Sequence, residues 1–548
     1  MTQSHPALPF RTAFQVYHVD ADTITDDQLT DICGGPVPLS GDKPILLAML
    51  RGVKTVVVER EYIDKDYRNV YSAYYSMKFS RSSSRATRLH FFQVRLSYAQ
   101  LFGTENQCPL SERLRDVAEQ QGVPVPAGTT PCYIGNVVLR PTEYSRIGRC
   151  LLDPRKVPRA SADRTTCMLA RFHATLMGHR LEVSAFPHQS QDAEVHICAQ
   201  TAVWGLFRYL SQKYPIYPEQ YPHDIAVSNT DLRHGRPLPG RGLTMGQVAA
   251  MFGEFGVDAE LYDLKMMRRL VKASASAASN GWASPAPIPL RSSGKKAQRW
   301  ERAQRELLHF LEVHLASGLP SVIGLPEHAA TAIGTVYATT PVSGREGAML
   351  RSSDFMAGVL VNDDNYAPYQ QLAIDQIGAS TNYAPLGEDV DTIVIPLPRK
   401  VFLTSEKAEF VVTNILNQLD RPSQAPVLVR RHFCTSSRNY KADRNRMADD
   451  FTEILLGQPL PHFLWITEIS ECGPDGPGAV VAEVAVDATA GPYDAMPCLW
   501  IRYRGWLAIN EDRLYGTPAL KASPSYQTIR SKVDFPILTF DHNLTRFT

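Results

Sequence analysis

The sequence predicts an α+β protein organised in three successive regions. Strand patterns and helical patterns are mixed in the first two regions, and strand patterns dominate the third. The length of 548 residues is compatible with two to four domains. We expect an N-terminal α+β module over residues 1–180, a core over residues 181–385 and a β-rich C-terminal domain over residues 386–548.

The composition is that of an ordinary globular protein. Hydrophobic residues make up 44% of the chain and charged residues 21%, which lets each domain bury its own core. The 57 basic and 56 acidic residues nearly cancel, which argues against nucleic acid or an anionic membrane as a bulk electrostatic partner. No apolar run approaches the roughly 20 residues that span a bilayer. The N-terminal segment lacks a signal-peptide pattern, and the nine cysteines are scattered without a CxxC, so we expect a cytoplasmic protein.

The N-terminal module contains several short elements and no catalytic motif. Its β-branched residues and their alternation predict strands, and an aromatic-rich segment predicts a helix. The expected helices cover residues 43–52 and 67–79, and the expected strands cover residues 54–63, 132–141 and 179–186.

The core region begins with a cysteine that precedes a helical pattern. Apolar residues follow Cys198 at helical spacing and predict an amphipathic helix that packs into a core: Ala202, Val203, Leu206, Phe207 and Leu210. Two further helices are expected over residues 243–257 and 297–318, and three strands over residues 319–325, 328–338 and 355–362. A stretch rich in Ala, Ser and Pro over residues 273–296 predicts a flexible insert.

The C-terminal domain is expected to consist mainly of strands. One helix near residues 443–456 interrupts them. The expected strands cover residues 391–397, 425–433, 462–469, 479–489 and 498–509.

Three residues of the core stand in an order that suits thiol chemistry. Cys198 opens a helix, where unpaired N–H groups and the helix dipole stabilise a thiolate. His328 opens a strand and could accept the thiol proton. Asp363 ends the next strand and could bind the second ring nitrogen of His328, which would fix the tautomer. Taken singly, each residue also suits a structural role, so the order in the chain carries the hypothesis.

Two of the site assignments have alternatives within the same segments. Gln191, seven residues before Cys198, could join the Cys198 backbone N–H as an oxyanion hole, and Gln189 is the alternative donor. The turn after the strand could present either Asp363 or Asp364. We prefer Asp363 because it comes first after the apolar run.

The same order resembles the papain-like cysteine peptidases, and within them the bacterial branch that includes the leader peptidases of bacteriocin exporters. The resemblance covers residues 181–385 and is carried by QDAEVHICAQTAVW, GLPSVIGLPEHAATAIGTVY and GVLVNDDNYAPY. It implies a helical half that bears the cysteine, packed on a twisted antiparallel sheet that bears the histidine and the acid. Cys198 would be the nucleophile, His328 the general base and then acid, Asp363 the orienting acid and Gln191 the oxyanion donor.

The resemblance implies a bacterial enzyme that cleaves a peptide or isopeptide bond in a specific protein through a thioester on Cys198. We expect neither a metal nor an organic cofactor, because HExxH, paired CxxC and tight histidine clusters are missing from the sequence. The flanking regions would recognise the protein substrate, for example an operon-encoded partner, or would hold the enzyme inactive until a partner binds. No nucleic-acid or membrane partner is expected.

Two other functions stay open. Ala199 and Glu327 stand where the family usually has glycine, so the core could be a catalytically degenerate fold that serves as a protein-binding scaffold. The order Cys, His, Asp also occurs in transglutaminases and arylamine acyltransferases. An amine could therefore take the place of water as the acyl acceptor.

Overall fold

The chain forms a mixed α/β structure with 31% helix, 34% strand and several antiparallel sheets. This agrees with the mixed class expected from the sequence. The expected insert at residues 273–296 lies almost entirely outside the described residues. The computed structural model describes residues 2–3, 14–36, 41–80, 82–102, 108–125, 129–157, 164–195, 197–228, 238–239, 242–274, 295–341, 349–374, 390–417, 427–494, 496–514 and 526–547.

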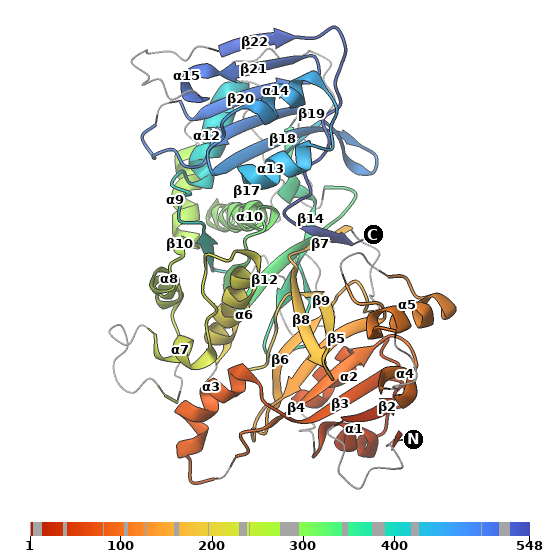
Figure 1. Cartoon of the computed structure of the whole chain (residues 1–548). Coiled ribbons are helices and arrows are strands. Elements are labelled where there is room, and N and C mark those ends of the chain that lie inside the picture. The colour runs from red at the N-terminus through yellow and green to blue at the C-terminus, as the bar shows by residue number, and fades with distance from the viewer. Residues whose placement is uncertain are drawn as a thin grey trace.

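Three sheets follow one another along the molecule, from the N-terminal sheet through the central sheet to the C-terminal sheet (Figure 1). The N-terminal sheet has six antiparallel strands in sequential order. They are β1 (Thr2–Gln3), β2 (Phe14–His18), β3 (Thr55–Tyr62), β4 (Ala86–Phe92), β5 (Tyr133–Leu139) and β6 (Ile147–Leu152). Its helices are α1 (Asp26–Cys33), α2 (Asp42–Met49), α3 (Lys65–Ala73), α4 (Tyr98–Phe102) and α5 (Leu110–Gln120), with a 3-10 turn, η1 (Tyr75–Met77), after α3.

Local signals account for the ends of several N-terminal elements. Helix α1 begins after Thr25, which forms a reciprocal capping box with Gln28, and ends at Gly34 with a left-handed φ of 67°. Helix α3 begins after Asp64, whose carboxylate accepts the backbone N–H groups of Asp66 and Tyr67 at 3.0 Å. A hairpin of β8 (Ala170–Leu176) and β9 (His179–Ala185) leads from this module to the next.

The central sheet is built around strand β12 (His328–Tyr337). Its main path runs β10–β16–β11–β12–β14–β15, and β7 (Arg164–Cys167) joins β12 to β23 (Thr545–Phe547). The other bounds are β10 (Asp258–Asp263), β16 (Thr392–Leu397), β11 (Ser321–Leu325), β14 (Met356–Asn362) and β15 (Gln370–Ala373). The helices of this region are α6 (Cys198–Lys213), α7 (Pro222–Val227), α8 (Met245–Glu254), α9 (Leu264–Ser274) and α10 (Lys295–Ala316).

Two strands of the central sheet come from the expected C-terminal region. Strand β16 pairs with both β10 and β11, and β23 pairs with β7. The interior residues of β16 are buried, as expected for a strand with neighbours on both sides. An apolar run indicates that a strand is buried but does not indicate which sheet receives it. The chain therefore does not pass from the central sheet to the C-terminal sheet at residue 386, where we expected the last domain to begin.

The C-terminal sheet runs β13–β17–β18–β19–β20–β21–β22, antiparallel except for the first pair. The bounds are β13 (Met349–Arg351), β17 (Leu428–Ser436), β18 (Phe463–Gly473), β19 (Gly476–Asp487), β20 (Cys498–Tyr503), β21 (Trp506–Asn510) and β22 (Tyr526–Arg530). Helix α10 lies between this sheet and the central one (Figure 1).

The C-terminal region contains more helix than the sequence predicted. The single helix expected at 443–456 is two, α13 (Ser437–Arg444) and α14 (Asp450–Gly457), because Asp449 caps the start of the second. Helix α12 (Ser405–Leu416) was not predicted, and a short helix, α15 (Glu511–Leu514), follows β21.

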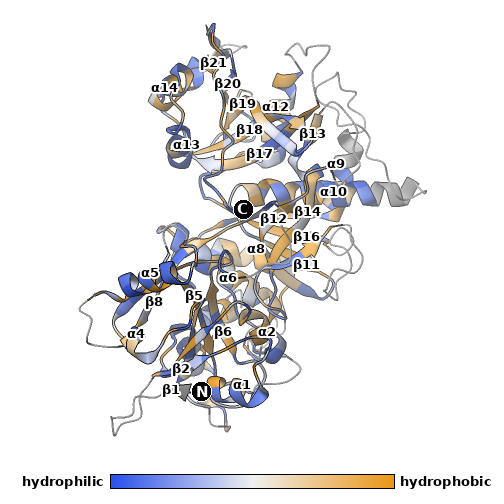
Figure 2. Cartoon of the chain, turned by 90° about the vertical axis from the view of Figure 1, so that its right-hand side faces the viewer, coloured by the Kyte–Doolittle hydropathy of each residue, from blue (hydrophilic) through white to orange (hydrophobic). Residues whose placement is uncertain are grey.

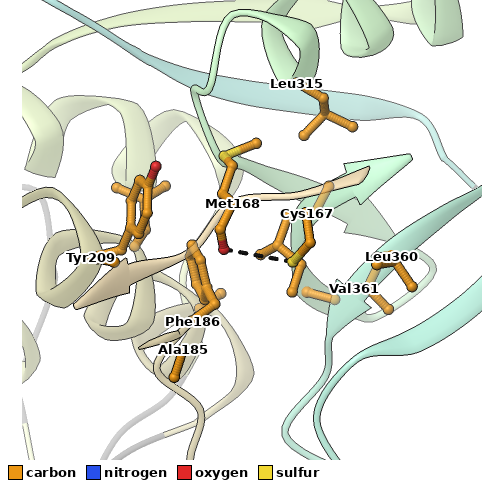
Figure 3. Packing of buried hydrophobic residues seen from close by; sticks show 14 of the residues in the cluster. Cys167, Met168, Ala185, Phe186, Tyr209, Leu315, Leu360 and Val361 are labelled. Atoms are coloured by element: carbon orange, nitrogen blue, oxygen red, sulfur yellow. Dashed lines mark hydrogen bonds between the residues drawn. The ribbon is translucent and has the colours of Figure 1, made fainter. Parts of the chain in front are cut away.

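Helix α6 is buried far more completely than the predicted amphipathic pattern implies. Every residue from 199 to 210 is buried, including polar Thr201 and Arg208. The core around it continues into β7 and β14, where Met168 and Cys167 lie between Tyr209 and Leu360 (Figure 3). Figure 2 shows hydrophobic residues concentrated in the central strands β12, β14 and β16. None of the described helices is long and apolar enough to cross a membrane.

Candidate active site

Cys198 occupies the first position of helix α6, as the sequence predicted. Ile197 precedes it in an extended conformation, and the backbone N–H of Ile197 donates to the Gln200 side-chain oxygen at 2.9 Å. The first intrahelical hydrogen bond runs from the Thr201 N–H to the Ile197 carbonyl at 3.0 Å. The Cys198 N–H therefore lies outside the intrahelical ladder, and the first turn contains no acidic residue. A thiolate here faces the positive end of the helix dipole.

His328 is placed by a tight turn between β11 and β12. Leu325 pairs directly with His328, so only Pro326 and Glu327 form the connection. Glu327 is exposed and has a left-handed φ of 56°, which matches the third position of a type II turn after proline. This position favours glycine, the residue expected there from the resemblance. The Thr331 hydroxyl donates to the Ala202 carbonyl at 3.1 Å and thereby holds β12 against α6.

Asp363 binds the ring of His328 from the end of β14. Its Oδ1 lies 3.0 Å from His328 Nε2 and also accepts the Asn365 backbone N–H at 2.9 Å. Asp363 is fully buried, so solvent competes little for this hydrogen bond. The Cys198 side chain lies close enough to His328 to contribute to the raised pKa of the ring. Because Nε2 faces Asp363, Nδ1 is the nitrogen left for the thiol.

The charges around His328 favour its protonated form. Burial opposes a charge on the ring, but the hydrogen bonds to Asp363 and Cys198 and the charges of Asp363 and Asp364 outweigh it and raise the pKa of His328 to about 10. At neutral pH, the ring therefore holds both protons.

The raised pKa predicts a loss of stability in alkaline solution. The pKa of His328 in the folded protein exceeds its ordinary value of 6.5, so its contribution is fully present below about pH 6.5 and disappears as the pH rises towards 10. We expect the difference in unfolding free energy between wild type and His328→Gln, measured in urea, to shrink from pH 6 to pH 10. A difference that stays constant over this range would contradict the raised pKa.

The structure separates the two candidate oxyanion donors. The Gln191 side chain donates from Nε2 to Asn365 Oδ1 at 2.9 Å and so supports the acidic turn. Gln189 is 2% exposed and lines the same pocket as Cys198. Its Nε2 has no hydrogen-bond partner among the described residues. The alternative donor, Gln189, is therefore the one that the structure brings to Cys198.

Gln189 is held in place by the N-terminal sheet. The backbone of His188 pairs with Cys150 on the edge strand β6, through hydrogen bonds of 2.7 and 3.1 Å. The Ser190 N–H continues this pairing to the Ile147 carbonyl at 3.1 Å. The segment that contains Gln189 thus forms a short extension of that sheet. The N-terminal module contributes directly to the site.

A small pocket lies beside Cys198, between α6, β12 and the acidic turn. Polar atoms without a hydrogen-bond partner among the described residues belong to its lining residues: His188 Nε2, Gln189 Nε2 and Thr201 Oγ1. Burial lowers the pKa of His188 to about 4. Burial, together with the charge of Asp363, raises the pKa of Asp364 to about 7 against the effect of His328.

Asp364 adds a second carboxylate beside His328. Its Oδ1 lies 3.5 Å from His328 Nε2, and ligand atoms of His328, Asp363 and Asp364 all lie within 4.8 Å of one another. Within the described ranges, this is the one group of at least three His, Cys, Asp or Glu side chains with spacing suited to a metal ion. The sequence presents both aspartates as alternatives for one role, and it did not predict that both lie beside the ring.

Comparisons with family models, with curated proteins and with solved structures find no match to this chain. The assignment of a function therefore depends on the geometry of the site.

Proposed function

We propose that the protein is a cysteine peptidase that cleaves a peptide or isopeptide bond through a thioester on Cys198. The observation that carries this proposal is the arrangement of three side chains. Cys198 begins a helix, His328 is within its hydrogen-bonding reach, and the other ring nitrogen of His328 binds buried Asp363. Nucleophile, base and orienting acid are the parts that covalent catalysis at a carbonyl requires.

The reaction follows from this geometry. The Cys198 thiolate, paired with the doubly protonated ring of His328, attacks the substrate carbonyl carbon. The Cys198 N–H and Gln189 Nε2 donate to the oxyanion. When the carbonyl re-forms, the C–N bond breaks, His328 protonates the departing amine and a thioester remains. Water then attacks the thioester as it gives a proton to His328. The C–S bond breaks, the acid leaves, and the thiolate and the doubly protonated ring are restored.

A papain-like core is consistent with these elements. A buried helix that begins with the cysteine packs against an antiparallel sheet, and the neighbouring strands β12 and β14 supply the histidine and the acid. The flanking sheets would select a protein substrate, and we place the enzyme in the bacterial cytoplasm. Glu327 is exposed at its turn, so its presence in place of glycine does not close the site.

The test is to map a peptide-like acyloxymethyl ketone onto the cysteines by mass spectrometry at pH 7. Cys108 and Cys472 are matched controls, because these thiols are partly exposed as Cys198 is. We expect Cys198 to react about 100-fold faster than either control, because an activated thiolate gains at least this factor from its base. His328→Ala should remove the advantage.

Equal reactivity of the three partly exposed thiols would contradict the proposal. If Cys198 reacts no faster than Cys108 and Cys472 in the wild-type protein, the peptidase proposal fails. The core would then be better described as a protein-binding scaffold. If Cys198 is selective, but the thioester that it forms with an activated ester reacts with added amines much faster than with water, the enzyme is an acyltransferase.

A further inference from the structure

We infer that Tyr369 is a positioning residue for the reaction: its hydroxyl fixes the 362–369 loop against the N-terminal module and thereby holds Asp363 against the ring of His328. The 362–369 loop begins at the last residue of β14 and contains both aspartates of the acidic turn. This role rests on the function proposed above, because the placement of Asp363 matters to a reaction only if Cys198 is the nucleophile.

The Tyr369 hydroxyl lies where three segments of the chain meet. It accepts the backbone N–H of Phe186, which directly follows β9, at 2.9 Å. It donates to the carbonyl of Leu152, the last residue of β6, at 2.7 Å. The Tyr369 side chain also packs against two hydrophobic cores, that of the N-terminal sheet and that around α6 and the central sheet. A single side chain of the central region thus joins the 362–369 loop to the N-terminal module.

The 362–369 loop is closed by a contact between its two ends. The backbone N–H of Tyr369 donates to Asn362 Oδ1 at 2.9 Å, and Asn362 Nδ2 donates to the Pro187 carbonyl at 3.2 Å. Tyr369 has a left-handed φ of 65°, a conformation that is costly for a large side chain and persists only where surrounding contacts hold it. Because Asp363 directly follows Asn362, a shift of the closed loop would move the carboxylate away from His328.

The segment that carries the oxyanion donor has anchors of its own. His188 pairs with the edge strand β6 through two backbone hydrogen bonds, and the Arg140 guanidinium donates to the Ser190 carbonyl at 2.9 Å. These contacts hold Gln189 from both sides and do not involve Tyr369. Loss of the Tyr369 hydroxyl should therefore displace the 362–369 loop and leave Gln189 in place.

A displaced loop would misalign the hydrogen bond of 3.0 Å between Asp363 and His328. The acid would then no longer fix the orientation of the ring beside Cys198. A misplacement of about 1 Å in a catalytic group can cost about 100-fold in rate. The hydroxyl of Tyr369, which touches none of the reacting atoms, would thus affect the reaction through Asp363.

The first test is the rate at which Cys198 is labelled by the same acyloxymethyl ketone, with Cys108 as the internal standard. Tyr369→Phe keeps the packed ring, removes only the hydroxyl, and should slow labelling about 10- to 100-fold. Tyr209→Phe is the matched control. Tyr209 stacks on Phe186, and its buried hydroxyl has no hydrogen-bond partner among the described residues, so its loss should leave the rate unchanged.

Combined variants separate a positioning role from a general structural effect. In an Asp363→Ala background, Tyr369→Phe should slow labelling less than about threefold, because the contact that Tyr369 supports is already gone. In a Gln189→Ala background, Tyr369→Phe should keep its full effect. A merely structural role would give the same factor in both backgrounds.

A proton resonance reports the placement of Asp363 without any reaction. The Nε2–H of His328, hydrogen-bonded to a buried carboxylate, should give a far-downfield signal in protein labelled with ¹⁵N-histidine. The signal is assigned by its absence from His328→Gln. Tyr369→Phe should move it upfield or broaden it, and Tyr209→Phe should leave it unchanged.

An unchanged labelling rate or an unchanged His328 signal in Tyr369→Phe would overturn the inference, and so would equal factors in the two backgrounds. Circular dichroism checks that each variant is folded. If Cys198 of the wild-type protein reacts no faster than Cys108, the proposed function fails. The His328 signal alone then decides whether Tyr369 holds Asp363 in place.

Discussion

Gln189→Ala is expected to slow acylation of Cys198 about 100- to 1,000-fold, whereas Gln191→Ala should change it less than about tenfold. Removing one oxyanion donor typically costs this larger factor, because the developing charge loses a preorganised hydrogen bond. Gln189 lines the Cys198 pocket with an unpaired Nε2, while the Nε2 of Gln191 is already bound to Asn365. Gln191 can act on the reaction only through the acidic turn.

The measurement does not require the natural substrate. Acylation by a p-nitrophenyl ester releases a burst of p-nitrophenolate whose rate reports the attack of Cys198. Gln189→Leu, which keeps the volume of the side chain but lacks a donor, should behave like Gln189→Ala. If Gln191→Ala causes the larger loss of acylation rate, Gln191 is the oxyanion donor, as first expected from the sequence. Gln189 then has only a structural role in the pocket.

The sequence predicted those parts of the site that short sequence patterns specify. The start of α6 at Cys198 follows from the apolar spacing within the helix itself. The strand that begins at His328 and the turn at Asp363 follow from apolar runs bounded by Pro or by Asp and Asn. Each of these patterns lies within about ten residues, which is the range over which backbone preferences act.

The features that the sequence did not predict depend on contacts between distant segments. The position of Gln189 depends on the pairing of His188 with Cys150. In the central sheet, β16 lies between β10 and β11, and β23 pairs with β7, so both placements join segments that are far apart in the chain. A turn with two aspartates is ordinarily exposed, but Asp364 is buried beside a pocket that α6, β12 and the segment of Gln189 line together. No local pattern contains this information.

Asp66→Ala is expected to destabilise the protein by about 1–3 kcal/mol, the cost of leaving buried donors without one of their partners. Asp66 lies on α3 of the N-terminal module and is 3% exposed. Its carboxylate accepts hydrogen bonds from Arg208 and Trp204 of α6 and forms an ion pair with Arg149 of β6. Without it, the guanidinium of Arg208, which is itself 2% exposed, keeps its ion pair with Glu219 but loses its counter-charge on α3.

The control is Asp22→Ala, which removes an exposed carboxylate from the same module and should change stability by less than about 0.5 kcal/mol. Urea unfolding followed by fluorescence measures both. A loss for Asp66→Ala close to that of Asp22→Ala would contradict the coupling. Because Trp204 and Arg208 lie on the helix that begins with Cys198, a large loss would show that the N-terminal module and α6 fold as one unit. The core could then not be isolated at residue 181 without exposing the Arg208 charge and releasing the segment that positions Gln189.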